Sequence, residues 1–195
     1  MKKHVITISR EYGSGGHEVG RLIAEDMGIP FYDRAYFEAA LMSGYEENVL
    51  RSREEKRNGS FAYNLAAALG VTGAIDEKYY RKQAELILRL YEEGSCVIVG
   101  RCADHILRDR NDVLRVFIYA DLDFRVKRAI DLKGVKPSKA EQVVQKTDKS
   151  RSNYYNFYSG KKWGLTENYD LCINRTKLTC EQVAEIIENY LKITE

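Results

Sequence analysis

Short apolar runs alternate with segments of helical periodicity along this chain of 195 residues. The first run, Val5–Ile8, leads into a Gly-rich segment, and apolar residues on one helical face follow it at positions 19, 22, 23 and 27. Further runs at 29–32, 96–99, 113–120 and 169–174 alternate with helical patterns at about 34–41, 77–93, 122–132 and 179–190. This alternation is typical of a parallel sheet covered by helices, so we predict an α/β fold with about five parallel strands.

Capping residues indicate where several of these helices begin. Asp33 precedes the second helical pattern and Thr179 precedes the last one, each at a position where a side chain can accept a backbone N–H. After a break at residues 133–137, Ser138 and Glu141 have the spacing of a capping box. The sequence therefore predicts a helix that starts at Ser138 and runs on toward residue 155.

Two regions have a weaker pattern. Residues 45–75 are charged and punctuated by glycine without clean periodicity, and we interpret them as a solvated segment. The helix predicted over residues 77–93 has apolar residues on more than one face, which offers a surface for a second copy. A homodimer is therefore left open as a partner arrangement.

Composition favours a soluble protein of one domain spanning residues 1–195. The chain is 44% hydrophobic and 31% charged, enough to bury one core, and its formal net charge is only +2. Such a balance gives no overall field for nucleic acid or a membrane surface. The sequence holds no apolar stretch long enough for a signal peptide or a membrane span, and its four cysteines form no CxxC pair. We expect a cytoplasmic protein.

The Gly-rich segment is the first candidate site. A strand, a loop with Gly13, Gly15 and Gly16, and an immediate helix place backbone N–H groups and a helix N-terminus around one point, which suits an anion. Glycine allows a phosphate to approach the backbone closely. We call residues 9–17 the phosphate-binding loop, although a tight turn between strand and helix fits the same pattern.

The phosphate-binding loop departs from the usual pattern GxxxxGK(S/T). If Gly15 takes the second glycine position, Arg10 stands at the first and Gly16 stands where the phosphate-contacting lysine belongs. His17 then replaces the hydroxyl residue that would hold Mg²⁺. The loop keeps the geometry of a phosphate site but lacks two of its chemical groups.

Motifs along nearly the whole chain resemble the cytidylate-kinase-like family of P-loop proteins. They are, in chain order, ISREYGSGGH at 8–17, FYDR at 31–34, VGR at 99–101, FRVKR at 124–128, the Tyr pair at 154–155, SGKKWG at 159–164 and NYDLC at 168–172. The resemblance implies a three-layer P-loop kinase fold with strand order 2-3-1-4-5 and helices on both faces. It also implies an acceptor-binding insert at about 34–75 and a helical lid at about 133–165.

The resemblance further implies roles for particular residues. The nucleotide phosphates of ATP would contact Arg10, Tyr12, Gly13, Ser14, Gly15, Gly16, His17 and Glu18. Catalysis would depend on Arg101, Arg128, Arg151 and Asp148, and the acceptor would contact Asp33, Arg34 and Arg101. Phosphoryl transfer needs positioning and charge neutralisation, which arginines supply.

Each assignment has a plainer alternative. Asp33 also suits a helix N-cap, Arg128 with Arg125 suits a solvated basic face, and Asp148 with Arg151 suits an i,i+3 ion pair. We hypothesise that Lys149, Lys161 or Lys162 replaces the missing loop lysine from the lid side. No clean metal-ligand set is visible, so we expect Mg²⁺ to be held chiefly by nucleotide oxygens and water.

The predicted function is ATP-dependent phosphoryl transfer to a nucleoside monophosphate, most simply CMP or dCMP. Alternatives are a P-loop kinase for another small molecule and a regulator that binds nucleotide without catalysis, the latter because of Gly16. A single-strand RNA-binding module is a third, since residues 151–163 interleave aromatic and basic side chains. Near-neutral charge argues against it, and an aromatic lid packed on the core explains the same residues.

Overall fold

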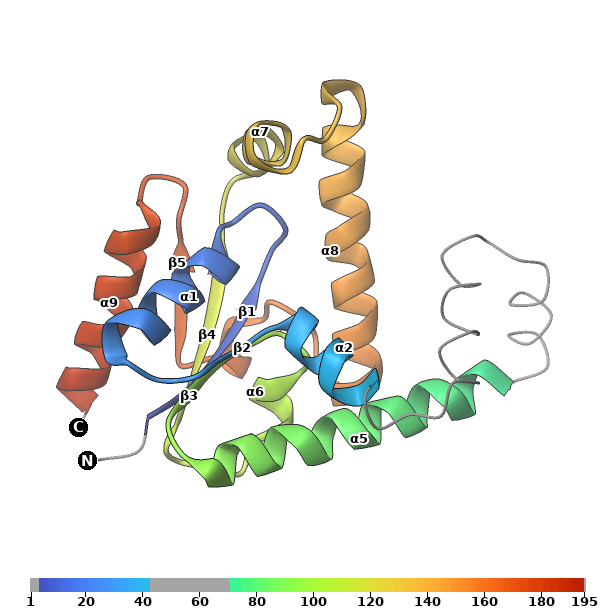
Figure 1. The fold of residues 1–195 in the computed structure, drawn as a ribbon. Coiled ribbons are helices and arrows are strands. Elements are labelled where there is room, and N and C mark those ends of the chain that lie inside the picture. The colour runs from blue at the N-terminus through green and yellow to red at the C-terminus, as the bar shows by residue number, and fades with distance from the viewer. Residues whose placement is uncertain (1–3, 43–70, 195) are drawn as a thin grey trace.

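A computed structural model describes residues 4–42 and 71–194 of the chain. Its strands are β1 Val5–Arg10, β2 Phe31–Tyr32, β3 Cys96–Val99, β4 Val113–Tyr119 and β5 Leu171–Asn174. They form one parallel sheet in the order β2-β3-β1-β4-β5, which confirms the predicted topology (Figure 1). The predicted acceptor-binding insert falls largely outside the described residues.

Helices connect the strands in the predicted alternation. They are α1 Gly16–Met27, α2 Arg34–Met42, α5 Val71–Glu93, α6 Ala103–Ile106, α7 Leu122–Lys133, α8 Pro137–Ser159 and α9 Cys180–Thr194, with a 3₁₀ turn at Thr166–Asn168. Within the described ranges, no helix combines the length and the apolar composition needed to cross a membrane.

One face of the sheet packs against α1 and α9. Ile6, Ile8 and Val116 of the central strands lie in a buried cluster with apolar residues of these two helices, among them Ile23 and Ile187. The hydrophobic face predicted for α1 packs on the sheet, and so do Val183 and Ile187 of α9, whereas Ile186 of the same predicted face is exposed.

The opposite face packs against α2, α5 and α6. Val5 and Ile98 of the sheet share a second buried cluster with Phe37 of α2, Ile87 of α5 and Leu107, which directly follows α6. Side chains of one strand alternate between the two clusters, as the pleat requires, so helices cover both faces and the three-layer prediction is confirmed.

The carboxyl ends of all five strands lie at one edge of the sheet because the strands are parallel. In open α/β sheets this is the edge where ligands bind. β1 ends at Arg10, and the other strands are followed by Asp33, Gly100-Arg101, Ala120-Asp121 and Arg175. Helix α7 and the beginning of α8 lie beyond this edge, at the top of Figure 1.

The predicted capping box at the start of α8 is wrong. The helix begins at Pro137, with Lys136 as N-cap and without a side-chain cap, so Ser138 already lies within the first turn. Proline fits the first helical position because its fixed φ is helical and it has no N–H to satisfy. Glu141 instead accepts a hydrogen bond from Gln145 one turn later.

The other two predicted caps are confirmed. Asp33 Oδ1 accepts the N–H of Tyr36 at 3.0 Å, and Thr179 Oγ1 accepts the N–H of Gln182 at 3.2 Å. The N–H of Thr179 in turn donates to Gln182 Oε1 at 2.9 Å, which completes a capping box from Thr179 to Gln182. Both helices therefore begin where the sequence indicated.

Aromatic side chains of the predicted lid pack on the body of the protein. Tyr158 of α8 stacks on Tyr80 of α5 with ring centroids 4.0 Å apart, and Trp163 packs edge-on against Phe117 of β4. Tyr154 also packs against Tyr80, and Tyr155 is buried, so four of the five aromatic residues that suggested a stacking surface for RNA pack on the body of the protein. Phe157 is the exception in this segment and is largely exposed.

Candidate active site

The phosphate-binding loop bends through two glycines with left-handed backbone. Gly13 has φ 82° and Gly15 has φ 89°, values that favour glycine over any residue with a side chain. Gly15 is the N-cap of α1 and offers no side-chain cap to its first N–H groups. The N–H groups of the first helical turn have no partner within the helix, so this end of α1 is suited to an anion.

Two hydrogen bonds at Ser14 fix the loop. The hydroxyl of the buried Ser14 donates to the carbonyl of Glu11 at 2.9 Å, and Arg175 Nη1 donates to the Ser14 carbonyl at 3.1 Å. A Cβ on Gly15 would lie only 2.9 Å from Arg175 Nη1, so the guanidinium occupies the space beside the glycine. Burial lowers the pKa of Arg175. No sequence motif marked this arginine, although it directly follows β5.

A buried ion-pair network joins the loop to α7 and α8. Arg125 lies between two carboxylates, pairing with Asp148 of α8 and, at 3.1 Å, with Glu11 of the loop. Asp148 also accepts the N–H of Tyr12 at 2.7 Å, and Arg125 donates to the Tyr12 carbonyl. Burial raises the pKa of Glu11. The network ties the loop to α7 and α8, and Glu11 and Arg125 were not among the predicted site residues.

Arg128 holds the outer side of the loop. Its Nε donates to the Gly13 carbonyl at 3.1 Å, and its Nη2 pairs with Glu18 in the first turn of α1. Arg125 and Arg128 do share a face of α7, as their spacing indicated. That face contacts the loop rather than solvent, so the alternative of a solvated basic face is wrong.

Asp148 and Arg151 lie one turn apart on α8 but do not pair with each other. Asp148 bonds to Tyr12 and Arg125, whereas Arg151 Nη1 donates to the carbonyl of Arg10 at 2.8 Å. The Arg151 guanidinium also lies over the Tyr12 ring, 5.7 Å from its centroid. The alternative of a local ion pair is therefore wrong, and both side chains reach the phosphate-binding loop.

Three arginines from different elements converge above the loop, and we call them the arginine cluster. They are Arg10 at the end of β1, Arg101 after β3 and Arg151 of α8. Burial, followed by the charges of Arg151 and Arg101, lowers the pKa of Arg10 to about 9. Arg10 remains charged at neutral pH, so the cluster concentrates positive charge at the carboxyl edge of the sheet.

Carboxylates balance part of this charge at the rim of the cluster. Glu38 of α2 pairs with Arg101 at 3.2 Å and with the exposed Arg34 at 2.7 Å. Burial would raise the pKa of Glu38, but the hydrogen bond from Arg34 and the charges of Arg34 and Arg101 outweigh it and lower that pKa. The negative charge of Asp33 raises the pKa of Arg10, but the two side chains form no ion pair.

Arg101 has a strained backbone that its surroundings hold in place. Arg101 and Cys102 have φ 63° and φ 55°, a left-handed conformation that is costly for residues with a Cβ. The fully buried Gln83 of α5 donates to the Arg101 carbonyl at 3.0 Å and to the Tyr154 hydroxyl at 3.1 Å. Strain of this kind is often retained where a side chain must point at a ligand. Gln83 was not selected from the sequence.

His17 in the first turn of α1 and Asp33 after β2 form a pair at the end of the loop. His17 Nε2 lies 2.9 Å from Asp33 Oδ2, and the imidazole packs edge-on against Phe31. Burial would raise the pKa of Asp33, but the hydrogen bonds from His17 and the Tyr36 N–H outweigh it and lower that pKa. The imidazole thus bonds to a carboxylate at the position where the usual loop has a metal-binding hydroxyl.

Asp104 of α6 is a buried carboxylate between β1 and α8. It is 3% exposed and accepts hydrogen bonds from Ser9 at 3.4 Å and from the Tyr155 hydroxyl at 2.8 Å. Burial raises its pKa despite these two donors. Asp104 therefore connects the end of β1, the start of α6 and the lower half of α8.

Substituting Asp104 by asparagine should change how stability depends on pH. A folded-state pKa above the ordinary value of 3.8 means that the folded form binds more protons, so the contribution of Asp104 is lost as pH rises from that value through the folded pKa. Asparagine cannot ionise, so the Asp104→Asn variant does not lose this contribution. Its free energy of unfolding, minus that of the parent, should therefore increase as pH rises across that window. Urea unfolding at pH 4 to 8 measures the difference. Asp109→Asn, at an exposed position, is the control, and a pH-independent difference for Asp104→Asn would contradict the expectation.

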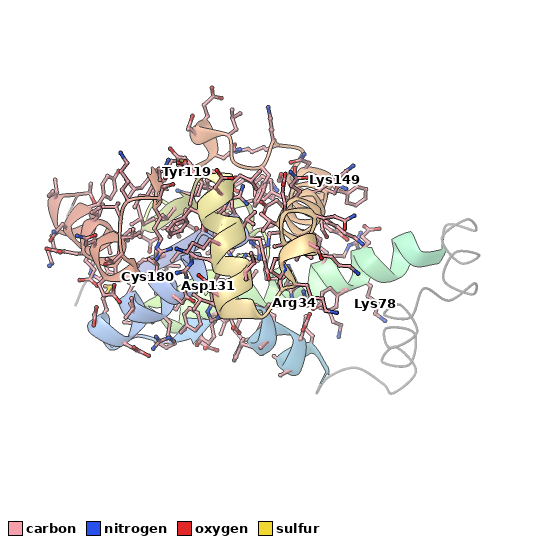
Figure 2. All side chains as sticks on the ribbon, turned by 90° about the horizontal axis from the view of Figure 1, so that it is seen from above. Arg34, Lys78, Tyr119, Asp131, Lys149 and Cys180 are labelled. Carbon is pink, nitrogen blue, oxygen red and sulfur yellow. The ribbon has the colours of Figure 1, made fainter. Side chains whose placement is uncertain are left out.

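The predicted lysines lie away from the loop contacts. Lys149 is exposed on α8, as Figure 2 shows in the view from above, and Lys161 and Lys162 are exposed beyond its end. Lys161 lowers the pKa of His105, secondary to burial of the imidazole, which places it by α6. Among the described residues, no group of three His, Cys, Asp or Glu side chains forms a metal site.

The sequence is similar to proteins of one family. The sequence model of the cytidylate kinase-like family matches residues 5–177. A cytidylate kinase from Methanosarcina barkeri is 27% identical over 185 residues, covering 94% of this chain and 93% of that protein.

Solved structures agree on the fold. An uncharacterized protein from Eubacterium ventriosum has a TM-score of 0.76 at 30% identity, covering 97% of this chain and 99% of that one. A shikimate kinase from Bacteroides thetaiotaomicron has a TM-score of 0.53 at 16% identity, covering 97% of this chain and 98% of the other. The second likeness shows the fold alone, with the same sheet order and covering helices.

Proposed function

Since the chain belongs to the cytidylate kinase-like family, we propose that it transfers the terminal phosphoryl group of ATP to a nucleoside monophosphate, with CMP or dCMP as the expected acceptor. The relatives support a nucleotide or small-molecule kinase in general. The observation that carries the narrower proposal is the arginine cluster. Three guanidinium groups beside a phosphate-binding loop suit a pair of substrates that both carry phosphate, ATP and a monophosphate, better than ATP with an uncharged acceptor.

The reaction requires few covalent roles from the protein. An oxygen of the acceptor monophosphate attacks the γ-phosphorus of ATP in line with the bond to the β-phosphate oxygen, which breaks to leave ADP. In the proposal, Arg101 binds the acceptor phosphate, and Arg151 neutralises charge on the transferred group. Arg128 and Asp148 act through the loop, because their contacts are with loop residues.

The loop fits the phosphates of ATP. Gly13 and Gly15 leave its backbone open, and the first turn of α1 presents N–H groups that have no side-chain cap. The loop presents no exposed hydroxyl at the usual metal position, because His17 stands there and pairs with Asp33, and Ser14 is fully buried. We therefore propose that nucleotide oxygens and water hold the metal ion, which adds positive charge along the phosphate chain when it is bound.

Residues 133–165 are proposed as the lid over this site. They contain α8, whose Arg151 and Asp148 already contact the phosphate-binding loop. The C-terminal half of α8 is fixed by two tyrosines, because Tyr154 accepts a hydrogen bond from Gln83 and Tyr155 donates one to Asp104. Because Arg151 already contacts the loop, closure would involve the first turns of α8, ahead of Asp148, and would shield the phosphates from water when substrates are present, which limits wasteful hydrolysis.

A second candidate is a kinase for a small alcohol. The pair of Asp33 and His17 favours it, because a carboxylate kept ionised beside an imidazole can accept the proton of a hydroxyl nucleophile. A monophosphate acceptor needs no such base at the reacting oxygen. The two candidates therefore differ in the role of Asp33, and the same assay separates them.

A coupled ADP-release assay tests the proposal. We expect turnover with CMP or dCMP above that with UMP, AMP, GMP or small alcohols such as shikimate and gluconate. Arg101→Ala should reduce kcat/KM for the monophosphate about 30- to 100-fold, because a charge-assisted contact to phosphate is lost. Arg89→Ala, an exposed arginine of α5, is the control and should behave like the parent.

Three outcomes would contradict the proposal or part of it. Turnover with an alcohol and with none of the monophosphates would favour the second candidate. ATP binding without transfer to any acceptor would indicate a nucleotide-binding regulator instead. An Arg101→Ala variant that folds and matches Arg89→Ala would remove this arginine from the acceptor site.

A further inference from the structure

The phosphate-binding loop differs from the usual pattern at both of its ends. The pattern GxxxxGK begins with glycine and ends with lysine, whereas this chain has Arg10 at the first position and Gly16 at the last. A cation stands where glycine is usual, and glycine stands where the cation is usual. Taken separately, the two changes give a loop that has lost its lysine and gained an unrelated arginine.

In the folded protein the two positions touch. A Cβ built on Gly16 would lie 2.6 Å from the Cβ of Arg10 and 3.0 Å from its Cγ. Real Cβ atoms do not approach this closely, so no side chain fits at position 16 while Arg10 is present. The stem of Arg10 thus fills the space from which a lysine at position 16 would start.

The head of the Arg10 side chain extends toward Gly100. A Cβ on Gly100 would lie 2.2 Å from Arg10 Nη1, so the guanidinium rests in the space that this glycine leaves open. Gly100 immediately precedes Arg101, and the charges of Arg101, Arg151, Arg34 and Asp33 all act on Arg10. The guanidinium therefore lies on the substrate side of the loop.

The structure leaves this cation without a partner. Over residues 4–42 and 71–194, no carboxylate forms an ion pair with Arg10 and no acceptor takes a hydrogen bond from its guanidinium. Its one hydrogen bond outside the sheet runs through the main-chain carbonyl, which accepts from Arg151. The side chain is mostly buried and faces two further arginines. An arginine in such a setting is stabilised by an anion, and five N–H donors are available for it.

We propose that Arg10 replaces the phosphate-contacting lysine of the loop, and that Gly16 and Gly100 are glycines because its side chain passes between them. The loop has exchanged its terminal residues: the cation now comes from the end of β1 instead of the start of α1. The ligand is the β- and γ-phosphates of a nucleoside triphosphate, which rests on the proposed function. Lys149, Lys161 and Lys162 are then not required for this role.

Three variants test the exchange. Arg10→Met keeps the stem and removes the charge. Gly16→Lys adds a lysine against the stem of Arg10. The double variant Arg10→Gly with Gly16→Lys rebuilds the usual pattern, with glycine first and lysine last. Affinity is measured by calorimetry with ATP and with inorganic tripolyphosphate, a probe that has no base or sugar.

Arg10→Met is expected to bind both ligands about 30-fold more weakly, since a charge-assisted contact is lost. Gly16→Lys should bind at least as weakly, or lose its folded loop, because its Cβ clashes with Arg10. The double variant should recover affinity to within about tenfold of the parent, so the two changes are strongly non-additive. Lys149→Ala and Lys162→Ala are controls and should bind like the parent.

Two results would overturn the inference. One is Arg10→Met, or Arg10→Gln should the methionine variant not fold, binding tripolyphosphate as tightly as the parent. The other is a double variant no better than Gly16→Lys alone. If the parent binds tripolyphosphate but transfers no phosphoryl group, the proposed function fails while the role of Arg10 is still measured by binding. If the parent binds neither ligand, both proposals fail.

Discussion

Replacing Arg151 by alanine is expected to lower kcat about 10³-fold, the smallest effect usual for an arginine that stabilises the transferring phosphoryl group. Arg151 comes from α8, lies over Tyr12 and already donates to the carbonyl of Arg10. Its remaining N–H groups have no hydrogen-bond acceptor within residues 4–42 and 71–194 and can meet charge that develops on the γ-phosphoryl group. Because this charge is greatest in the transition state, kcat should fall far more than the affinity for ATP.

Single-turnover kinetics with saturating ATP and CMP measure this effect without interference from product release. Arg151→Lys keeps a point charge without the planar fork, and we expect it to recover only part of the rate. Lys149→Ala removes an exposed cation from the same helix and is the matched control. If Arg151→Ala changed the ATP dissociation constant as much as kcat, Arg151 would be a ground-state binding residue.

The fold could be predicted because its signals are local. The β-branched run that starts at Val5 and the apolar faces of α1 and α9 are repeated patterns, and the strand order followed from the resemblance. The start of α8 was misplaced because Ser138 and Glu141 have capping-box spacing while Pro137 favours an earlier start. The two local preferences compete there, and the fixed φ of proline prevails.

The site was only partly predictable, for a different reason. Gly13, Gly15 and Arg151 belong to recognisable motifs, so their positions at the loop could be expected. Arg175 and Gln83 could not, because each acts through contacts with residues far away in the chain, at separations that no sequence pattern encodes. A strand-end rule would have found Arg175, since it follows β5 as Arg101 closely follows β3.

The ion-pair partners of the predicted site residues could not be read from the sequence either. Asp148 and Arg151 have the spacing of an ion pair, and only the approach of Arg125 from α7 shows why they separate. The same approach gives Glu11 its role, because a loop glutamate without a cation would be costly to bury. Which charges meet in a buried network depends on how helices pack, and packing is decided by the whole core.

Replacing Arg125 by methionine is expected to destabilise the fold by about 3–5 kcal/mol, the usual cost of leaving buried charge without its partner. Arg125 is 9% exposed and separates Glu11 from Asp148. Methionine fills much of the volume but brings no charge, so two carboxylates would face each other beside the phosphate-binding loop. The Tyr12 carbonyl would also lose a donor. Urea unfolding at pH 7 measures the loss.

The pH dependence separates this cause from simple loss of packing. Burial already raises the pKa of Glu11 from 4.5, and without Arg125 the raised value should rise further. A folded-state pKa above the unfolded one favours the folded form at low pH, and that contribution is lost as pH rises. The destabilisation should therefore be smaller at pH 4 than at pH 7. Arg21→Met, which breaks an exposed i,i+4 pair with Glu25, should cost well under about 1 kcal/mol at either pH. A loss for Arg125→Met that is equal at both pH values would mean that packing, rather than the two carboxylates, sets its cost.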